Sequence, residues 1–201
     1  MRALVVGLYP PPACEEARGT MAMVRYLAKQ DHDVEVMGQA YSAAQLRARI
    51  DGPSGAWELY RQRRKYDEIY VMIEAVLRFP VGKFGRYTRI IDTGVWAAVL
   101  KRTQNACLVV NEPAQIPGSV GGRTGRMLWQ AAPRMLVPNE YTGRMLVEQG
   151  GAPAERVQVA EVGADFTPAR WNSGWAGVTD QRDAVATIRR RAADDRRADE
   201  S

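Results

Sequence analysis

Short runs of aliphatic and β-branched residues alternate with amphipathic segments along most of this chain, and this alternation restricts the fold more than any other feature. The first run, Arg2 to Leu8, ends in Tyr9-Pro10-Pro11-Pro12, where the prolines cannot donate to a strand ladder. Apolar residues recur every three or four positions from Glu15 to Gln30, which predicts a helix, and Val34 to Met37 predicts a second strand. This order is typical of the βαβ unit of a parallel sheet.

The same pattern continues to about residue 160. It predicts further helices at 42–50, 57–65, 95–103, 126–132 and 141–149, further strands at 68–74, 88–91, 107–110, 135–137 and 157–160, and loops at 52–55 and 118–125. We expect Ser42 to cap the first of these helices and Asp92 or Thr93 to cap the helix that begins at Val95.

The repeated order of strand and helix predicts an α/β fold, a single Rossmann-like doubly wound parallel sheet flanked by helices, with right-handed crossovers. We expect residues 1–168 to form this domain, and residues 169–201 to form a Trp/Gly linker and a polar tail that is helical, at 180–191, or disordered. Ligands of such sheets bind beyond the carboxyl ends of the strands, which here are followed by the loops 9–16, 74–80, 111–122, 138–141 and 163–166.

The net charge of +5 and the pI of about 9.4 come from the folded part, since acidic and basic residues balance in the tail. The excess gathers at Arg61 to Lys65, at Lys83 to Arg89, and at Arg123 and Arg126. Two interpretations stay open for these residues: a solvated basic surface, or a contact with phosphate or acidic lipid. We predict no specific binding of nucleic acid.

Several classes of site are disfavoured by the sequence. Cys14 and Cys107 are far apart and His32 is the single histidine, so we predict neither a zinc site nor a disulfide scaffold, and no metal. The first strand is not followed by GxGxxG, and the glycine-rich segment 118–124 lacks the ending of a P-loop, so we predict no cofactor. No apolar run reaches the roughly 18 residues of a membrane span, and we expect a cytoplasmic protein with, at most, peripheral membrane contact.

Two segments together resemble glycosyltransferase family 4, whose members have the GT-B fold. At the front these are Leu8-Tyr9-Pro10-Pro11-Pro12, a helix, and His32-Asp33-Val34-Glu35-Val36. At the back these are Leu136-Val137-Pro138-Asn139-Glu140-Tyr141-Thr142, then Glu155-Arg156-Val157, then Gly163-Ala164-Asp165. The resemblance covers residues 1–168 and corresponds to the N-terminal, acceptor-side domain of that family.

The departures from the family pattern are informative. Ala13-Cys14-Glu15-Glu16 stands where the family has a Gly-Gly pair. The two glutamates suit the first turn of a helix, at the positive end of its dipole, and they would also repel a diphosphate there. Asn111-Glu112-Pro113 stands where the family commonly has a His-Asp pair, and Glu112 either contacts a ligand or caps the next loop. After Gly163 the sequence has one glutamate, Glu200, and no strand pattern, so we expect these residues to contain no donor-binding domain.

The resemblance implies ligand contacts on the loops at the carboxyl ends of the strands, without assigning a catalytic residue. The candidate ligand-binding residues are Pro12, Ala13, Cys14, Glu15, Glu112, Asn139, Tyr141, Arg144, Gly163 and Asp165. For Tyr141 and Arg144, the alternative is that they anchor the helix that follows Pro138.

Three hypotheses of function remain. The chain is the acceptor-side half of a glycosyltransferase that needs a separate donor-binding subunit, or a homo-oligomer, and sugar nucleotide is its co-substrate only when such a partner supplies the donor site. Alternatively, it is a degenerate, noncatalytic relative that serves as a binding or structural module. In the third hypothesis, it is a module that binds anionic membrane through its basic residues.

Overall fold

The computed structural model describes residues 1–7, 15–37, 52–76, 85–111 and 122–160. Within these ranges, six strands form one all-parallel sheet in the order β2-β1-β3-β4-β5-β6. The strands are β1 (Arg2–Val6), β2 (Asp33–Met37), β3 (Glu68–Met72), β4 (Ala106–Val109), β5 (Arg134–Val137) and β6 (Val157–Val159). The predicted α/β fold with a parallel, Rossmann-like sheet is confirmed.

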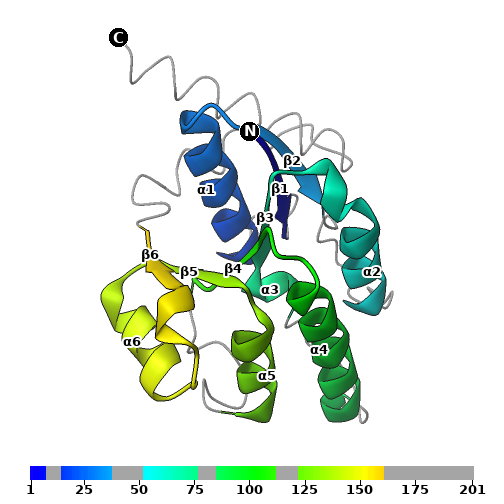
Figure 1. Cartoon of the computed structure of the whole chain (residues 1–201), viewed down its shortest axis with the longest axis vertical. Helices are drawn as coiled ribbons and strands as arrows, with labels where there is room; N and C mark the ends of the chain where they lie inside the picture. Colours follow the sequence, from blue (N-terminus) through cyan, green and yellow to red (C-terminus); the bar gives the residue numbers. More distant parts are fainter. Residues whose placement is uncertain (8–14, 38–51, 77–84, 112–121, 161–201) are drawn as a thin grey trace.

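Helices cover both faces of the sheet, as an all-parallel sheet requires. They are α1 (Glu15–Lys29), α2 (Gly52–Gln62), α3 (Ile73–Val76), α4 (Gly85–Lys101), α5 (Arg123–Ala131) and α6 (Glu140–Glu148), with single 3₁₀ turns η1 (Arg63–Lys65) and η3 (Ala154–Arg156). Helix α1 packs on one face, whereas α2, α4, α5 and α6 pack on the other (Figure 1).

Strand order explains this distribution of helices. The chain leaves β1 toward β2 in one direction, then crosses back past β1 to β3 and continues to β6 in the opposite direction. Because crossovers between parallel strands are right-handed, reversing the direction moves the connecting helix to the other face. Alternate residues of β1 therefore enter two cores, Ala3 and Val5 beneath α1, and Leu4 and Val6 beneath the remaining helices.

Three predictions made from the sequence were wrong. Residues 88–91 lie inside α4 and not in a strand, because the apolar spacing of Val95, Trp96 and Val99 continues one long helix backward through them. Asp92 and Thr93 are therefore interior helical residues, and neither is a cap. The expected loop at 52–55 is the first turn of α2, where a proline is tolerated because the N–H that it lacks has no helical partner.

Other boundaries shift by a few residues. Strand β3 ends at Met72 and the short helix α3 follows, although the apolar run had predicted strand through Glu74. Helix α5 begins at Arg123, inside the segment predicted to be a loop to Gly125. The predicted helix at 42–50 with Ser42, the loop residues 9–14 and 118–121, and the linker and tail from 169 lie outside the described residues.

Candidate functional site

The carboxyl ends of β1 and β3 lie side by side where the strand order reverses, and the chain leaves them in opposite directions. In open parallel sheets this topological switch point is the usual place for a ligand. Helix α1 follows β1, so its N-terminal end faces the same edge of the sheet, which we call the carboxyl edge. The described residues at this edge therefore define the candidate site.

Gly7 makes the close packing at the switch point possible. Its N–H continues the ladder beyond β1 by donating to the carbonyl of Met37 at 3.0 Å. A Cβ on residue 7 would lie 2.3 Å from Thr20 Oγ1 of α1 and 2.8 Å from Met72 Cγ at the end of β3. Helix and sheet thus approach each other over a position that has no room for a side chain.

A second close approach places an amide at the same edge. A Cβ on Gly19 of α1 would lie 2.5 Å from Asn111 Nδ2, and Asn111 follows the end of β4. The Asn111 side chain is partly exposed, and it forms no hydrogen bond with another described residue. An amide both donates and accepts hydrogen bonds, so this one is suited to a ligand that carries hydroxyl groups.

Asn139 lies at the carboxyl end of the neighbouring strand β5 and serves as a helix cap. Its side-chain oxygen accepts a hydrogen bond of 2.9 Å from the backbone N–H of Thr142, at the start of α6. Tyr141 is 67 % exposed and Arg144 is also exposed, so neither packs as an anchor of this helix. The structure thus brings Asn111 and Asn139 to adjacent strand ends and leaves Tyr141 and Arg144 on the surface of α6.

The remaining predicted site residues are not placed. Pro12, Ala13, Cys14, Glu112, Gly163 and Asp165 lie outside the described residues. Glu15 is the first residue of α1, and only its backbone is described. Sequence reasoning missed Gly19 and Thr20, although an isolated glycine within a helical pattern is a signal of close packing.

Replacing Asn139 tests its role as a cap. We expect Asn139→Ala to lower the free energy of unfolding by about 1 kcal/mol, because the Thr142 N–H loses its acceptor. Asn139→Asp keeps an acceptor at the same position and should retain most of the stability. Urea unfolding followed by circular dichroism measures both variants, and equal loss in the two would contradict the capping role.

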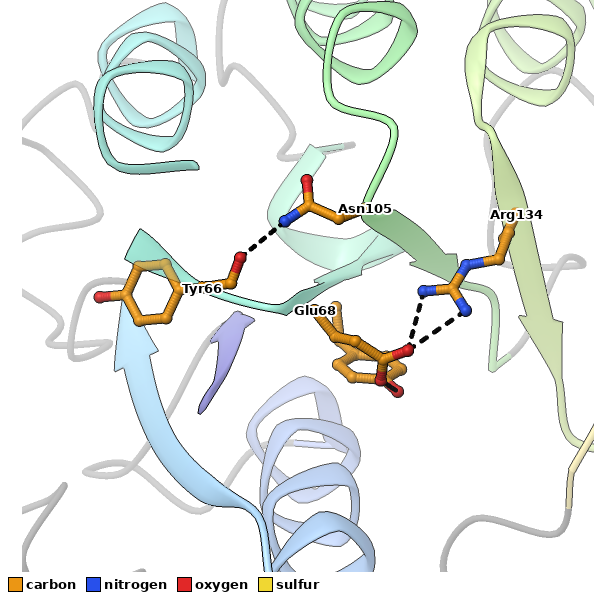
Figure 2. Close-up of polar contacts among 5 residues, drawn as sticks. Tyr66, Glu68, Asn105 and Arg134 are labelled. Carbon is orange, nitrogen blue, oxygen red and sulfur yellow. Dashed lines mark hydrogen bonds and ion pairs between the residues drawn. The ribbon is translucent and has the colours of Figure 1, made fainter. Parts of the chain in front are cut away.

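The opposite, amino edge of the sheet is held together by polar contacts. Arg2 pairs with Glu35, and the backbone N–H of Arg2 donates to Asp67 at 2.7 Å. The Tyr66 hydroxyl donates to Glu35 at 2.7 Å, and Asn105 Nδ2 donates to the carbonyl of Tyr66 at 2.9 Å (Figure 2). These groups satisfy one another across β1, β2, β3 and the start of β4, so they contribute to stability.

A second group of polar side chains at this edge has residue types that are common in catalytic sites, but their protonation states do not suit catalysis. Arg134 donates to Glu68 Oε1 through both terminal nitrogens, at 3.3 and 3.2 Å (Figure 2), and the Tyr70 hydroxyl donates to the same carboxylate. Cys107 lies between them in register on β4. Burial raises the pKa of Cys107 to about 12, and burial followed by the bond to Glu68 raises the pKa of Tyr70 above its usual value. Neither group is a nucleophile or base at neutral pH.

These raised pKa values predict a loss of stability in alkali. Both groups are held neutral by the fold, so their contribution is complete below the ordinary values of 9.0 for Cys107 and 10.0 for Tyr70. It is lost as the pH rises through the higher folded-state values. We expect Cys107→Ala and Tyr70→Phe each to flatten the decline in unfolding free energy above about pH 9, measured by urea unfolding from pH 7 to 11.

The matched control for that series is Tyr141→Phe, which removes a hydroxyl from an exposed ring. It should leave the alkaline decline as steep as in the parent chain. The same slope in Tyr70→Phe and in the parent would contradict the assignment.

The described residues lack the features of two other classes of site. Within these ranges, no three His, Cys, Asp or Glu side chains lie close enough to hold a metal ion. None of the helices that the structure describes is long and apolar enough to cross a bilayer.

Comparisons with known proteins add little to this geometry. No protein-family model matches the chain, and a search of curated proteins found no match. Among solved structures, the chain is similar to FerB, a flavoenzyme NAD(P)H:(acceptor) oxidoreductase from Paracoccus denitrificans, with 11% sequence identity and a TM-score of 0.27 over 96% of this chain and 92% of that one. A likeness of this size carries no argument about reaction or cofactor.

Proposed function

We propose that this chain is the acceptor-side half of a sugar-nucleotide-dependent glycosyl transfer system. A separate donor-binding subunit, outside residues 1–201, supplies the other half. The acceptor binds at the carboxyl edge, beside the switch point between β1 and β3. The observation that carries the proposal is the Asn111 amide, which lies against Gly19 at this edge and forms no hydrogen bond with another described residue.

The chemistry of this edge suits a neutral, hydroxylated acceptor. The Asn111 amide can accept a hydrogen bond from one hydroxyl and donate to another, which orients an acceptor without removing its proton. We assign no general base. Thr20 and Met72 pack tightly around Gly7 at this edge.

The start of α1 supports a division of labour between two subunits. Glu15 is the first residue of this helix, at the end where the helix dipole is positive. A carboxylate in this position competes with a bound diphosphate. The diphosphate of a sugar nucleotide is therefore better held by a partner than by this helix.

The segment that resembles glycosyltransferase family 4 at 136–142 also has a physical role at this edge. It runs from β5 through Asn139 into the first turn of α6, so Asn139 caps the N-terminus of this helix at the carboxyl end of β5. This use of the motif supports an acceptor-side domain by analogy of fold and position.

The alternative is a noncatalytic binding module that uses the same edge. Glutamates in place of the family's Gly-Gly pair favour this alternative, because they remove a phosphate-binding feature and put nothing catalytic in its place. The two proposals share a binding site and differ only in whether sugar is transferred.

Two asparagines at opposite ends of β4 give a matched test. Asn111 lies at the carboxyl end, whereas Asn105 at the amino end donates to the carbonyl of Tyr66. In a transfer assay with labelled UDP-glucose and GDP-mannose, we expect activity from the chain with its co-purified partner, and none from the chain alone. Asn111→Ala should lower that activity at least tenfold and leave the thermal midpoint unchanged. Asn105→Ala should lower the free energy of unfolding by about 1 kcal/mol, and with it the thermal midpoint, while the folded protein keeps its activity.

Several results would contradict the proposal. Transfer by the purified chain alone would remove the need for a partner. A pull-down that captures no donor-binding protein, together with a lysate that transfers nothing, would favour the noncatalytic module. The proposal also includes a cytoplasmic location, which fractionation of cells that express the tagged chain would test.

A further inference from the structure

Cations from two segments far apart in the sequence gather at one corner of the amino edge. One group lies at the end of α2 and in η1, and the other lies at the end of α4. Asn105 joins them, because its Nδ2 donates to the carbonyl of Tyr66 at 2.9 Å (Figure 2) and to the carbonyl of Arg63 at 3.4 Å. We call the exposed members the basic corner: Arg61, Arg64, Lys65, Lys101 and Arg102.

The positive charge of the basic corner is little neutralised by the residues around it. Arg61 pairs with Glu58 at 3.1 Å, and its side chain remains 73% exposed. In the part of the chain that the structure describes, no carboxylate forms an ion pair with the other four cations. The corner therefore presents several unpaired positive charges to the solvent, a strong attraction for an anionic surface.

An exposed tryptophan lies beside these cations. Trp57 is 55 % exposed, and Trp57, Arg61 and Arg64 follow at spacings of four and three residues along the same side of α2 and η1. The Trp57 ring packs edge-on against Tyr60, at a centroid distance of 6.1 Å, and Arg63 stacks over the other ring at 3.7 Å. Trp57 is thus held in place although more than half of its surface is open.

We propose that Trp57 and the basic corner together dock this protein on an anionic lipid surface. Tryptophan beside arginine and lysine is the combination that settles at the headgroup level of membranes, with the ring in the interface and the cations on anionic lipid. Trp57 and Arg61 belong to α2, Lys101 belongs to α4, and these two helices pack against each other on the same face of the sheet (Figure 1). One lipid surface can therefore contact residues of both helices.

The geometry favours lipid over nucleic acid. Proteins that bind single-stranded nucleic acid stack successive bases on aromatic rings along a charged groove. Here the planes of Trp57 and Tyr60 are 87° apart, and Arg63 occupies the Tyr60 face. The two rings cannot form a shared stacking platform.

The position of the basic corner determines how the protein would sit on the membrane. The corner lies at the amino ends of the strands, and the candidate site lies at their carboxyl ends. Docking therefore tethers the protein with the site turned away from the lipid, and the lipid is not delivered to Asn111. This inference does not depend on the proposed transfer activity.

Vesicle flotation with the full chain tests the proposal. Vesicles of phosphatidylcholine with 30% phosphatidylglycerol are compared with phosphatidylcholine alone at 0.1 M salt. A cation near an anionic membrane contributes about 1 kcal/mol, a factor of about five in binding. We therefore expect R64E/K65E and K101E/R102E each to reduce partitioning onto the anionic vesicles at least about 30-fold, and 0.5 M salt to weaken the binding of the parent chain.

Trp57→Ala should give a smaller loss that persists when the salt is raised. The matched control is R123E/R126E, which makes the same change in net charge at two exposed positions on α5 and should leave flotation within about twofold. Circular dichroism checks that each variant is folded. The two reversals lie on different elements, so failure of one to fold leaves the other as the test.

Three outcomes would overturn the proposal. One is equal loss in R123E/R126E and in the corner variants, which would indicate a general charge effect. Another is parent binding that does not depend on the phosphatidylglycerol content. The third is that charge reversal at the basic corner abolishes binding of a fluorescent single-stranded oligonucleotide, while vesicle binding stays unchanged.

Discussion

Trp129→Ala should lower the free energy of unfolding by about 3–5 kcal/mol, the largest loss that we expect from any single change in this chain. Trp129 is 0% exposed and lies on α5, in the larger core between the sheet and the helices α2, α4, α5 and α6. Removing the indole leaves a cavity that packed neighbours fill only in part. Since single domains are stable by about 5–15 kcal/mol, this loss is a large share of the total.

The chain contains a matched control for this variant. Trp57 is 55% exposed, so Trp57→Ala should change the unfolding free energy by less than about 0.5 kcal/mol. Urea unfolding monitored by circular dichroism measures both variants on the same scale. Similar losses for the two tryptophans would contradict the placement of α5 on the sheet.

Gly7→Ala is the second change with a large expected effect, and we expect it to cost about 1–3 kcal/mol. The added methyl group would lie 2.3 Å from Thr20 Oγ1, and Thr20 is fully buried. To relieve this overlap, α1 would have to move away from the end of β1, because Met72 Cγ lies on the other side, 2.8 Å from the added methyl group. The expected cost therefore comes from overpacking at the switch point.

Two other glycines give opposite controls. At Gly94 in α4 the nearest atom to an added methyl group is Met127 Cε, at 3.6 Å, so Gly94→Ala should be neutral or stabilising by up to about 1 kcal/mol. At Gly19 the obstacle is the tip of the Asn111 side chain, which can rotate away. Gly19→Ala should thus keep the stability and displace the amide, with loss of the transfer activity proposed for this edge.

Thermal and urea unfolding of the three glycine variants would separate these effects. A Gly7→Ala variant as stable as the parent would show that α1 lies farther from β1 than the structure places it. A Gly19→Ala variant that keeps full activity would argue against Asn111 as a ligand contact.

Local patterns in the sequence were enough to predict the α/β class and most of the elements. The helix at Glu15–Lys29 and the strands on either side of it depend on the spacing of apolar residues. The cap at Asn139 was seen only in the structure, because the sequence had suggested a ligand contact for this residue. The same reasoning failed at 88–91, where four residues with strand-like composition belong to α4. Short runs are ambiguous, because the elements that they pack against decide their conformation.

The candidate surfaces were harder to predict from the sequence. The sequence identified three basic clusters, at Arg61 to Lys65, at Lys83 to Arg89, and at Arg123 and Arg126. The structure instead adds Lys101 and Arg102, because Asn105 joins the end of α4 to the turn before β3. The side chains at 83–89 lie outside the described residues.

The sequence alone determined the alternating elements and the parallel sheet, because these follow from periodicity and from the handedness of crossovers. The general rule for such sheets also predicts the edge at which a ligand would bind. Only the tertiary structure decided the strand order, the contact of Asn111 with Gly19 and the position of the basic corner opposite the site. These depend on which strands pair and on how closely α1 approaches the sheet. Both are set by packing between residues far apart in the chain, which no local pattern encodes.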